Sequence, residues 1–215
     1  MELPPLKLDR DGLVTVVAQD RASGEVRMVA HANEEALRRT AETGLAHFYS
    51  RSRKRLWCKG EESGNTLAVS AIWLDCDADA AIYLVAPRGP TCHTGRPSCF
   101  FVRAHGGGEA ARALPVLAEL EAVLEARRGA DAGASYTRAL LDGGAPKIGA
   151  KIREEAAELA EAIAGESDAR VVAEAADLVY HAMVGLISRG LSLRDVQVAL
   201  SERFGVSGHE EKASR

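Results

Sequence analysis

In the first half of the chain, apolar and polar residues alternate with a period close to two. This period predicts β-strands, because successive side chains of a strand point to opposite faces of a sheet. One helix is expected between the strands: Asn33 can cap its first turn, its body extends to about Thr43, and Gly44 stands just after its end, where glycine is favoured. We expect a buried strand at 13–18 and further strands around 26–30, around 69–73 and at 82–85.

Beyond about residue 114 the apolar period changes to 3.6, which predicts helices. Pro115 suits a first helical turn. Ser135 can cap a short helix, and Gly143 and Gly144 would end it. The final helix opens with Ser192-x-x-Asp195, a pattern similar to a capping box. The expected helices lie at 136–141, at about 147–164, at about 168–188 and from Ser192 onward.

The change of period predicts two domains of different class. Residues 1–105 are expected to form an α+β domain, mainly antiparallel β with a helix, and residues 114–215 an all-α helical bundle. Residues 106–113 begin with three glycines and are typical of a linker.

The charge of the chain divides at the same place. Residues 1–105 hold 14 Lys and Arg against 13 Asp and Glu (net +1), whereas residues 106–215 hold 13 against 18 (net −5). An acidic chain without a basic stripe is not typical of proteins that bind nucleic acid or an anionic membrane. We find no apolar N-terminal segment and no run near the roughly 18 apolar residues of a membrane span. A cytoplasmic protein is therefore expected, in which cysteines stay reduced.

Three aspartates and a cysteine alternate at residues 75–79. If this segment continues the preceding strand, Asp75, Asp77 and Asp79 point to one side and Cys76 to the other. Three carboxylates on one face repel each other, so a divalent cation such as Mg²⁺ is the natural counter-charge. A solvated turn is the alternative, and an EF-hand is excluded because its required Gly and Glu are missing.

Cys92 and Cys99 lie seven residues apart in the loop that follows. Together with Cys76 they could hold one zinc ion and leave its fourth position to water, as in catalytic zinc sites. His93 could then act as general acid or base. Ordinary buried cysteines, or a structural zinc site completed by His93 or Cys58, are the alternatives, because no CxxC or HExxH motif decides between them.

A basic run precedes these motifs and leads into the loop at 60–65. Backbone amides and the hydroxyl of this loop could hold a phosphate, whereas the basic run taken alone favours a solvated surface. The run consists of Arg51, Arg53, Lys54, Arg55 and Lys59.

Three strings carry a family resemblance: Ser50-Arg-Ser-Arg-x-x-Leu56-Trp-x-Lys59-Gly-Glu-x-Ser-Gly-Asn65, Leu74-Asp-Cys-Asp-x-Asp79 and Gly89-Pro-x-Cys-His-Thr-Gly-Arg-x-Ser-Cys99. With them, residues 10–103 resemble phosphoribosyl-AMP cyclohydrolase, an enzyme of histidine biosynthesis. The resemblance implies zinc on Cys76, Cys92 and Cys99, and a homodimer whose zinc ligands come from both subunits. It also implies Mg²⁺ on Asp75, Asp77 and Asp79. Pro97 departs from the family, which commonly has a second arginine there. Substrate contacts are expected at Arg51, Ser52, Lys59, Ser63, Gly64, Asn65, Thr94 and Arg96.

Acidic residues in the second half recur at helical spacing. At about 100° per residue, one arc holds Lys151, Glu154, Glu155, Glu158 and Glu161, and the opposite arc holds Ile152, Ala156, Leu159 and Ile163. A solvated acidic face is the common alternative. In the next helix Glu174 and Asp177 share a face. Asp177 stands in an apolar run, so we expect it to be buried with a cation or a donor as partner. Facing helices with inward carboxylates would form a metal site.

Glu-Glu-x-x-Glu followed by Glu-x-x-Asp resembles the all-α nucleotide pyrophosphohydrolases. Flanking strings such as Ser135-Tyr-Thr, Lys147-Ile-x-x-Lys151 and Gly190-Leu-Ser-Leu narrow the resemblance, over residues 114–204, to phosphoribosyl-ATP pyrophosphohydrolase. His181 lies on the metal-facing arc but suits a packed core histidine equally well. The resemblance implies Mg²⁺ on Glu154, Glu155, Glu158, Glu174 and Asp177, with Lys147 and Lys151 as triphosphate contacts.

The sequence therefore predicts a bifunctional hydrolase of histidine biosynthesis. The second domain would hydrolyse phosphoribosyl-ATP to phosphoribosyl-AMP and pyrophosphate with Mg²⁺. The first would open the adenine ring of phosphoribosyl-AMP at N1–C6 with zinc-activated water. One alternative is a general nucleotide pyrophosphohydrolase beside a structural zinc domain, and another is a zinc-stabilised nucleotide-binding regulator.

Overall fold

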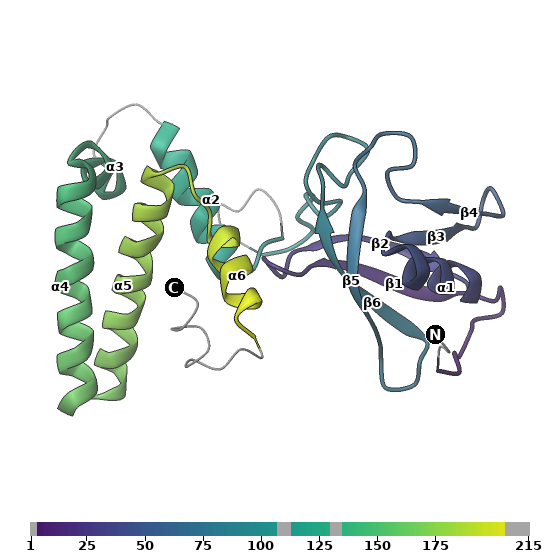
Figure 1. Ribbon diagram of the computed structural model, residues 1–215, viewed down its shortest axis with the longest axis horizontal. Helices are drawn as coiled ribbons and strands as arrows, with labels where there is room; N and C mark the ends of the chain where they lie inside the picture. The colour runs from purple at the N-terminus through teal and green to yellow at the C-terminus, as the bar shows by residue number, and fades with distance from the viewer. Residues whose placement is uncertain (1–3, 107–112, 130–134, 205–215) are drawn as a thin grey trace. The chain divides into compact units, whose positions relative to one another are not determined.

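The computed structural model describes residues 4–106, 113–129 and 135–204, so the expected linker at 106–113 lies almost entirely outside the described residues. The chain divides into two compact units, Met1–Pro115 and Val116–Arg215. The first contains a β-sheet with a helix, and the second is helical throughout its described residues (Figure 1). The predicted fold class, an α+β domain followed by an all-α domain, is confirmed.

A four-stranded sheet in the order β2-β1-β6-β5 forms the centre of the first unit. Two of its pairs, β1 with β2 and β5 with β6, are antiparallel, but β1 and β6 are parallel, with Val16 opposite Ala81. The alternation of apolar residues does not distinguish these directions, so the parallel pair was not predicted. The strands are β1 (Val14–Asp20), β2 (Val26–Ala32), β5 (Leu67–Leu74) and β6 (Ala80–Pro87); β3 (His47–Ser50) and β4 (Arg55–Cys58) form a separate antiparallel pair.

Helix α1 (Glu34–Thr43) packs beside β3 and begins and ends where the sequence predicts. The side chain of Asn33 accepts a hydrogen bond from the Ala36 amide at 2.9 Å. Gly44 ends the helix with φ at +66°, a conformation that favours glycine. Strand β1 differs from the prediction, because Thr15 is exposed between Val14 and Val16 and the strand is only half buried.

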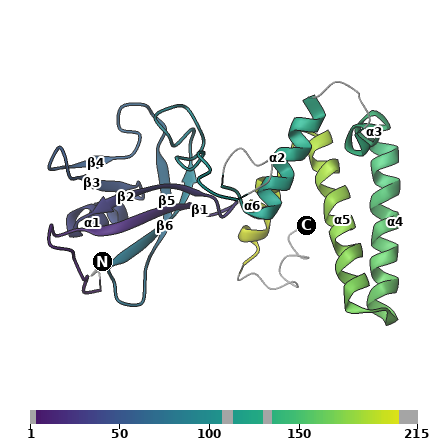
Figure 2. The same ribbon diagram turned by 180° about the vertical axis from the view of Figure 1, so that it is seen from behind.

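The second unit is built around two long helices, α4 (Gly144–Gly165) and α5 (Asp168–Ser188), which lie side by side in both views (Figures 1 and 2). Helix α4 begins at Gly144 and not at 147 as predicted. Gly143 is helical and caps the preceding helix, so Pro146 occupies a first turn in which its missing N–H is not needed. The other helices are α2 (Val116–Gly129), α3 (Tyr136–Asp142) and α6 (Leu193–Glu202).

Among the described residues, α5 is the one helix long and apolar enough to cross a membrane, judged by length and composition alone. The sequence expectation rested on uninterrupted apolar runs and did not single this helix out. Core helices of soluble proteins satisfy the same criterion. Here α5 packs against α4 and buries Glu174 and His181, so its apolar composition is weak support for a membrane span.

Candidate active sites

The loop that carries Cys92 and Cys99 is fixed to the outer edge of β2. The Cys99 amide donates to the carbonyl oxygen of Arg27 at 2.9 Å, and the buried Ser98 hydroxyl donates to that of Val26 at 2.7 Å. Within the loop, the Cys92 amide donates to the carbonyl oxygen of Arg96 at 3.0 Å. Because β2 is an edge strand, its unpaired backbone groups are available to hold this loop.

The two thiols lie beside each other and have different surroundings. The Thr94 hydroxyl donates to the sulfur of Cys92 at 3.1 Å and lowers the pKa of that thiol, because a hydrogen bond stabilises the thiolate. Desolvation raises the pKa of Cys99, and the neighbouring Cys92 adds to that effect. Burial lowers the pKa of Lys59, although the nearby cysteines oppose the shift. The thiols therefore have a cation and a hydroxyl donor close by.

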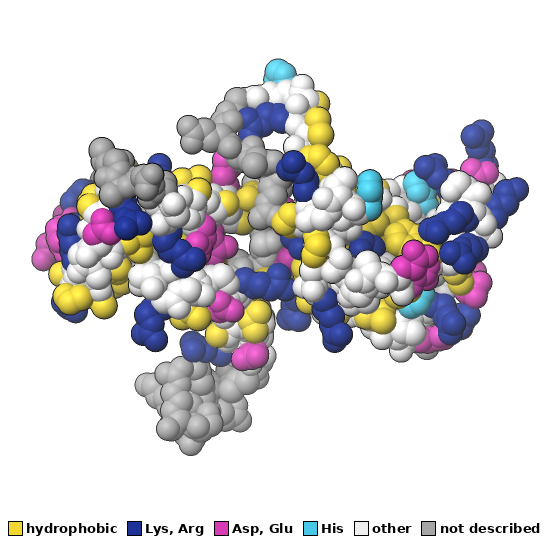
Figure 3. All heavy atoms as spheres, turned by 90° about the horizontal axis from the view of Figure 1, so that it is seen from above, with side chains coloured by type: hydrophobic (Ala, Val, Ile, Leu, Met, Phe, Trp, Pro, Cys, Tyr) yellow, Lys and Arg dark blue, Asp and Glu magenta, His cyan; other side chains and the backbone are white. Residues whose placement is uncertain are grey.

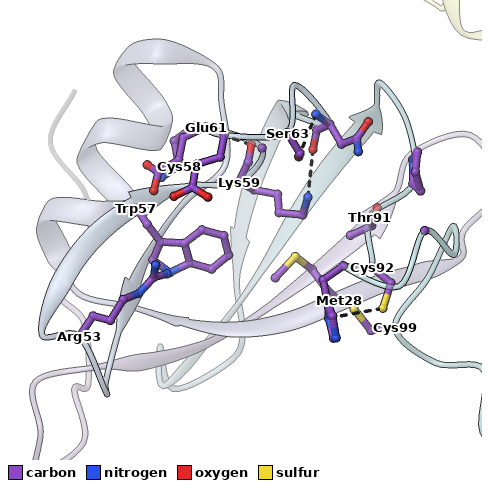
Figure 4. Close-up of a pocket in the computed structure, with 16 residues that line it drawn as sticks. Met28, Arg53, Trp57, Cys58, Lys59, Glu61, Ser63, Thr91, Cys92 and Cys99 are labelled. Carbon is purple, nitrogen blue, oxygen red and sulfur yellow. Dashed lines mark hydrogen bonds between the residues drawn. The ribbon is translucent and has the colours of Figure 1, made fainter.

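A cavity of about 500 Å³ lies between this loop and the segment after β4 (Figure 4). Its size is typical of a small-molecule site. The ammonium of Lys59 reaches across it and donates to the carbonyl oxygen of Asn65 at 3.0 Å. The lining residues predicted from sequence are Lys59, Ser63, Asn65, Cys92, His93 and Cys99.

Two glycines allow the loop at 60–65 to pack closely. A Cβ at Gly60, where φ is +85°, would lie 2.5 Å from the backbone of Asn65. A Cβ at Gly89 would lie 2.3 Å from Asn65 Oδ1. Such distances are far shorter than a van der Waals contact, so both positions require glycine for Asn65 to stand at the cavity wall.

The other predicted substrate contacts lie outside this lining. Arg51 and Ser52 are exposed in the turn between β3 and β4, the end of the first unit where Lys and Arg side chains gather (Figure 3). Gly64 is exposed in the 60–65 loop. Thr94 binds Cys92, and the Arg96 guanidinium lies 4.4 Å from the centre of the Phe101 ring.

Asp75, Asp77 and Asp79 form the turn between β5 and β6, so the strand assumed for them is wrong. Asp75 Oδ1 accepts hydrogen bonds from the amides of Asp79 and Ala80, both at 3.1 Å, which closes the turn. One carboxylate oxygen from each aspartate nevertheless lies within 4.8 Å of the others. Lys7 pairs with Asp77, lowering the pKa of that carboxyl. The aspartates are exposed, and their clustering alone does not demonstrate a metal site.

Cys76 belongs to the same turn and is not brought together with the other two predicted zinc ligands. It precedes β6, whereas Cys92 follows β6, and the eight residues of this strand span about 23 Å at roughly 3.3 Å per residue. Cys99 is held near Arg27, at the far end of the sheet from the turn. One chain therefore presents two of the three predicted zinc ligands at the cavity, which Cys58 also lines.

In the second unit, Glu155, Glu158 and Glu174 bring one carboxylate oxygen each within 4.8 Å of the others. They come from the facing helices α4 and α5. Glu174 is 2% exposed, and its Oε2 has no hydrogen-bond partner among the residues that the structure describes. Burial and the neighbouring carboxylates raise the pKa of Glu174, while Arg170 opposes the shift. A buried carboxylate oxygen without a partner, in an all-oxygen cluster, fits a hard divalent cation such as Mg²⁺.

The helix-wheel prediction was partly wrong about which side chains are buried. Asp177 is exposed, whereas Glu174 and His181, two turns apart on α5, face inward. Ile163, assigned to the apolar arc of α4, is 66% exposed. An apolar run indicates that a helix packs against the rest of the protein, but it does not identify which side of the helix is buried. For α5 the contact with α4 determines the buried side. Glu154 is also exposed.

The predicted triphosphate contacts already have partners. Lys151 bridges Glu154 and Glu155 at 3.0 and 2.9 Å, and both carboxylates raise its pKa. Lys147, which is exposed, donates to the carbonyl oxygen of Ala139 at 3.1 Å.

His181 connects the carboxylates to α3. Its Nδ1 lies 2.8 Å from the carbonyl oxygen of Asp177 and 3.7 Å from Glu155 Oε1. Its Nε2 lies 3.0 Å from the Tyr136 hydroxyl. A histidine with both ring nitrogens engaged is positioned to orient its neighbours.

One charged residue at the glutamate cluster was missed from sequence. Arg170 contacts Glu158, Glu166 and Glu174. The i, i+4 spacing from Glu166 to Arg170 and from Arg170 to Glu174 was a readable signal. The contact with Glu158 depends on the packing of α4 against α5 and could not be inferred from the sequence.

Comparison with known proteins gives two family matches in order along the chain. Residues 28–101 match the phosphoribosyl-AMP cyclohydrolase family, and residues 117–204 match the phosphoribosyl-ATP pyrophosphohydrolase family. The chain is 48% identical to "Histidine biosynthesis bifunctional protein HisIE" of Photobacterium profundum, over 90% of this chain and 93% of that protein. It is 44% identical to the protein of the same name from Wolinella succinogenes, over 96% and 94%, and 43% identical to that from Pyrococcus furiosus, over 90% and 92%.

Proposed function

Because the chain belongs to the bifunctional histidine-biosynthesis family that joins a phosphoribosyl-AMP cyclohydrolase to a phosphoribosyl-ATP pyrophosphohydrolase, we propose that both of its active sites work with bound metal ions. The enzyme carries both activities, and the substrates are small phosphorylated nucleotides. The cyclohydrolase match of the first unit argues against a purely structural zinc domain or a regulator without turnover. We assign the cyclohydrolase to residues 1–105 and the pyrophosphohydrolase to residues 114–215.

For pyrophosphate release, the observation that supports the metal site most strongly is Glu174 Oε2, which lies in the carboxylate cluster and has no partner within residues 4–106, 113–129 and 135–204. Glu155, Glu158 and Glu174 would hold Mg²⁺, with the exposed Glu154 and Asp177 as further ligands or ligands to water. When bound, Mg²⁺ would neutralise the triphosphate and help to activate water at the α–β linkage. Lys151 holds Glu155 in place, and its charge offsets the repulsion between the glutamates.

For ring opening, Cys92 and Cys99 at the cavity wall would supply two of three zinc ligands. When bound, zinc would activate water for attack at C6 of the adenine ring. Lys59, Ser63 and Asn65 line the cavity and would hold the phosphoribosyl group. The other predicted contacts, Arg51, Ser52, Gly64, Thr94 and Arg96, lie outside the lining and would reach the substrate only from the surrounding loops. His93 is exposed at the same cavity and would move a proton to or from the ring. The aspartates of the β5–β6 turn would hold Mg²⁺ near the zinc ligand Cys76.

A homodimer would resolve the separation between Cys76 and the other two thiols. A two-fold axis can bring the β5–β6 turn of one copy to the cavity of the other, and the same contact then occurs twice. The second unit also exposes apolar side chains on α4 and α5, notably Ile163 and Val172 at 66% and 69% exposure. Such a face is typical of a subunit interface.

The two activities can be separated by single substitutions. Glu158→Gln should stop pyrophosphate release from phosphoribosyl-ATP and spare ring opening of supplied phosphoribosyl-AMP. Cys92→Ser should have the reverse effect. Product analysis by chromatography, with folding checked by circular dichroism, distinguishes the outcomes. Full pyrophosphate release by folded Glu158→Gln protein would contradict the carboxylate site, and full ring opening by Cys92→Ser protein would contradict the zinc site.

A further inference from the structure

Arg170, in the first turn of α5, places its guanidinium on the carboxylates that we propose as metal ligands. It contacts Glu174 Oε1 at 2.5 Å and Glu158 Oε2 at 3.4 Å. Its third contact, with Glu166 Oε2 at 3.4 Å, lies just after the end of α4. One guanidinium therefore joins α4, α5 and the connection between them.

A divalent cation and this guanidinium would need the same two carboxylates, those of Glu158 and Glu174. Glu158 and Glu174 both belong to the group whose ligand atoms lie within 4.8 Å of one another. An ion bound among those atoms would bring its positive charge next to the guanidinium, and the two cations would repel each other. Arg170 also leaves the site incompletely satisfied, because Glu174 Oε2 is buried and accepts no hydrogen bond from the described part of the chain. The guanidinium is thus a partial substitute for a small cation that could contact all three carboxylates.

We propose that Arg170 is an exchangeable cation of the pyrophosphohydrolase site: it neutralises Glu158 and Glu174 when metal is absent, and metal binding releases it to hold the pyrophosphate leaving group. The inference rests on the proposed carboxylate metal site.

The proposed contact between the released guanidinium and pyrophosphate follows from the charge of Arg170 and from its exposure. Arg170 is 51% exposed, so its guanidinium can turn toward solvent without leaving the rim of the site. Once metal occupies the carboxylates, the guanidinium loses its partners just as the triphosphate brings several negative charges. Arginine matches phosphate oxygens with two parallel donors. The two lysines expected to contact the triphosphate are engaged elsewhere, Lys147 with Ala139 and Lys151 with Glu154 and Glu155.

If Arg170 and the metal exchange, one substitution should strengthen Mg²⁺ binding and weaken pyrophosphate binding. Isothermal titration of Mg²⁺ into Arg170→Ala protein should show about tenfold tighter binding than in the unsubstituted chain, since tenfold corresponds to about 1.4 kcal/mol, near the low end for a hydrogen bond to a charged group. At saturating Mg²⁺, inorganic pyrophosphate should bind about tenfold more weakly, for the same reason. The affinities of Arg170→Lys protein for Mg²⁺ and pyrophosphate should fall between those of Arg170→Ala protein and the unsubstituted chain, because lysine keeps the charge but lacks the paired donors.

Both titrations are made on the full chain carrying Asp77→Asn and Asp79→Asn, so that the aspartate turn does not contribute. Arg38→Ala is the matched control: Arg38 forms an i, i+4 ion pair with Glu42 at 2.7 Å and is 53% exposed. That substitution should change neither affinity. The exchange would be overturned if Arg170→Ala protein bound Mg²⁺ with unchanged affinity, if it bound both ligands more weakly, or if its pyrophosphate binding were unchanged. Absence of Mg²⁺ binding in every variant would instead overturn the proposed carboxylate site.

Discussion

The hydroxyl of Ser98 donates a hydrogen bond to the carbonyl oxygen of Val26, 2.7 Å away and 72 positions earlier in the chain. The same hydroxyl accepts from the Phe100 amide at 3.0 Å, and the side chain is 1% exposed. Ser98 immediately precedes Cys99, so this buried hydroxyl ties a proposed zinc ligand to the edge of the sheet.

Ser98→Ala should therefore impair ring opening indirectly, by loosening the position of Cys99 and not by changing a contact with the substrate. A lost hydrogen bond that leaves buried groups unpaired costs about 1–3 kcal/mol of unfolding free energy in the first unit. We expect faster loss of zinc to a chelator and slower ring opening, with pyrophosphate release unchanged. Ser70→Ala is the control, because the Ser70 hydroxyl also donates to a backbone carbonyl, that of Leu84 at 3.1 Å, but from an exposed position on β5. Equal zinc retention in both variants would rule out an anchoring role.

Mixing two inactive variants tests whether the zinc site is shared between subunits. In a mixed dimer of Cys76→Ser and Cys92→Ser chains, one of the two sites would draw all its ligands from unsubstituted positions. If chains exchange at random, half of the dimers are mixed, so ring opening should recover to about a quarter of the unsubstituted rate.

The matched control is a mixture of Cys92→Ser with Cys99→Ser. Cys92 and Cys99 of each site would come from the same chain. Every site in a mixed dimer of these two variants would therefore lack one ligand and stay defective. Recovery in this control would show that the cysteines are not partitioned as proposed. Failure of Cys76→Ser and Cys92→Ser chains to recover, after subunit exchange is verified by mass spectrometry, would place all zinc ligands within one chain.

Local signals in the sequence were sufficient where one short segment determines the structure. Asn33 and Gly44 predicted both ends of α1 because a cap depends on its own few neighbours. The cysteine motif likewise predicted residues that line the cavity, Cys92, His93 and Cys99, and their roles stay predictions. Gly143 and Gly144 end α3 as predicted, but the start of α4 was missed because α4 begins at Gly144, with Gly143 alone between the two helices.

Contacts between elements were beyond the reach of the sequence pattern. Asp177 and Glu174 share a face within one turn of α5, and only the position of α4 decides that Glu174 is the buried member. The separation of Cys99 from the turn that carries Cys76 depends on the parallel pairing of β1 with β6, which periodicity does not encode.

The buried hydroxyl of Tyr83 predicts a loss of stability at high pH. Burial raises the pKa of Tyr83 from 10.0 to about 12, although a hydrogen bond with Thr40 opposes the shift. Below pH 10 the phenol is protonated in both the folded and the unfolded chain. Between pH 10 and 12 the unfolded chain loses its proton first, so the free energy of unfolding should fall by about 2–3 kcal/mol.

Tyr83→Phe should remove that part of the pH dependence and lower stability at pH 8 by about 1 kcal/mol, through loss of the hydrogen bonds to Thr40 and His47. Urea unfolding followed by tryptophan fluorescence reports on the first unit, because Trp57 and Trp73 both lie there. The same slope above pH 10 in both proteins would assign the effect to other groups.

Metal removal should affect the two reactions differently, because their proposed ligands differ in kind. Thiolates hold zinc tightly, whereas carboxylates hold Mg²⁺ weakly and leave it several waters. Gel filtration without a chelator should therefore yield protein with about one zinc per chain and no pyrophosphate release until Mg²⁺ is added. Ring opening is assayed with Mg²⁺ added for the aspartates of the β5–β6 turn. Prior treatment with a strong chelator should abolish it, and Mg²⁺ alone should then restore only pyrophosphate release. Metal content is measured by atomic emission, with Cys92→Ser as the zinc-deficient reference. If the gel-filtered protein released pyrophosphate at its full rate without added Mg²⁺, the cluster of Glu155, Glu158 and Glu174 would not be a readily emptied Mg²⁺ site.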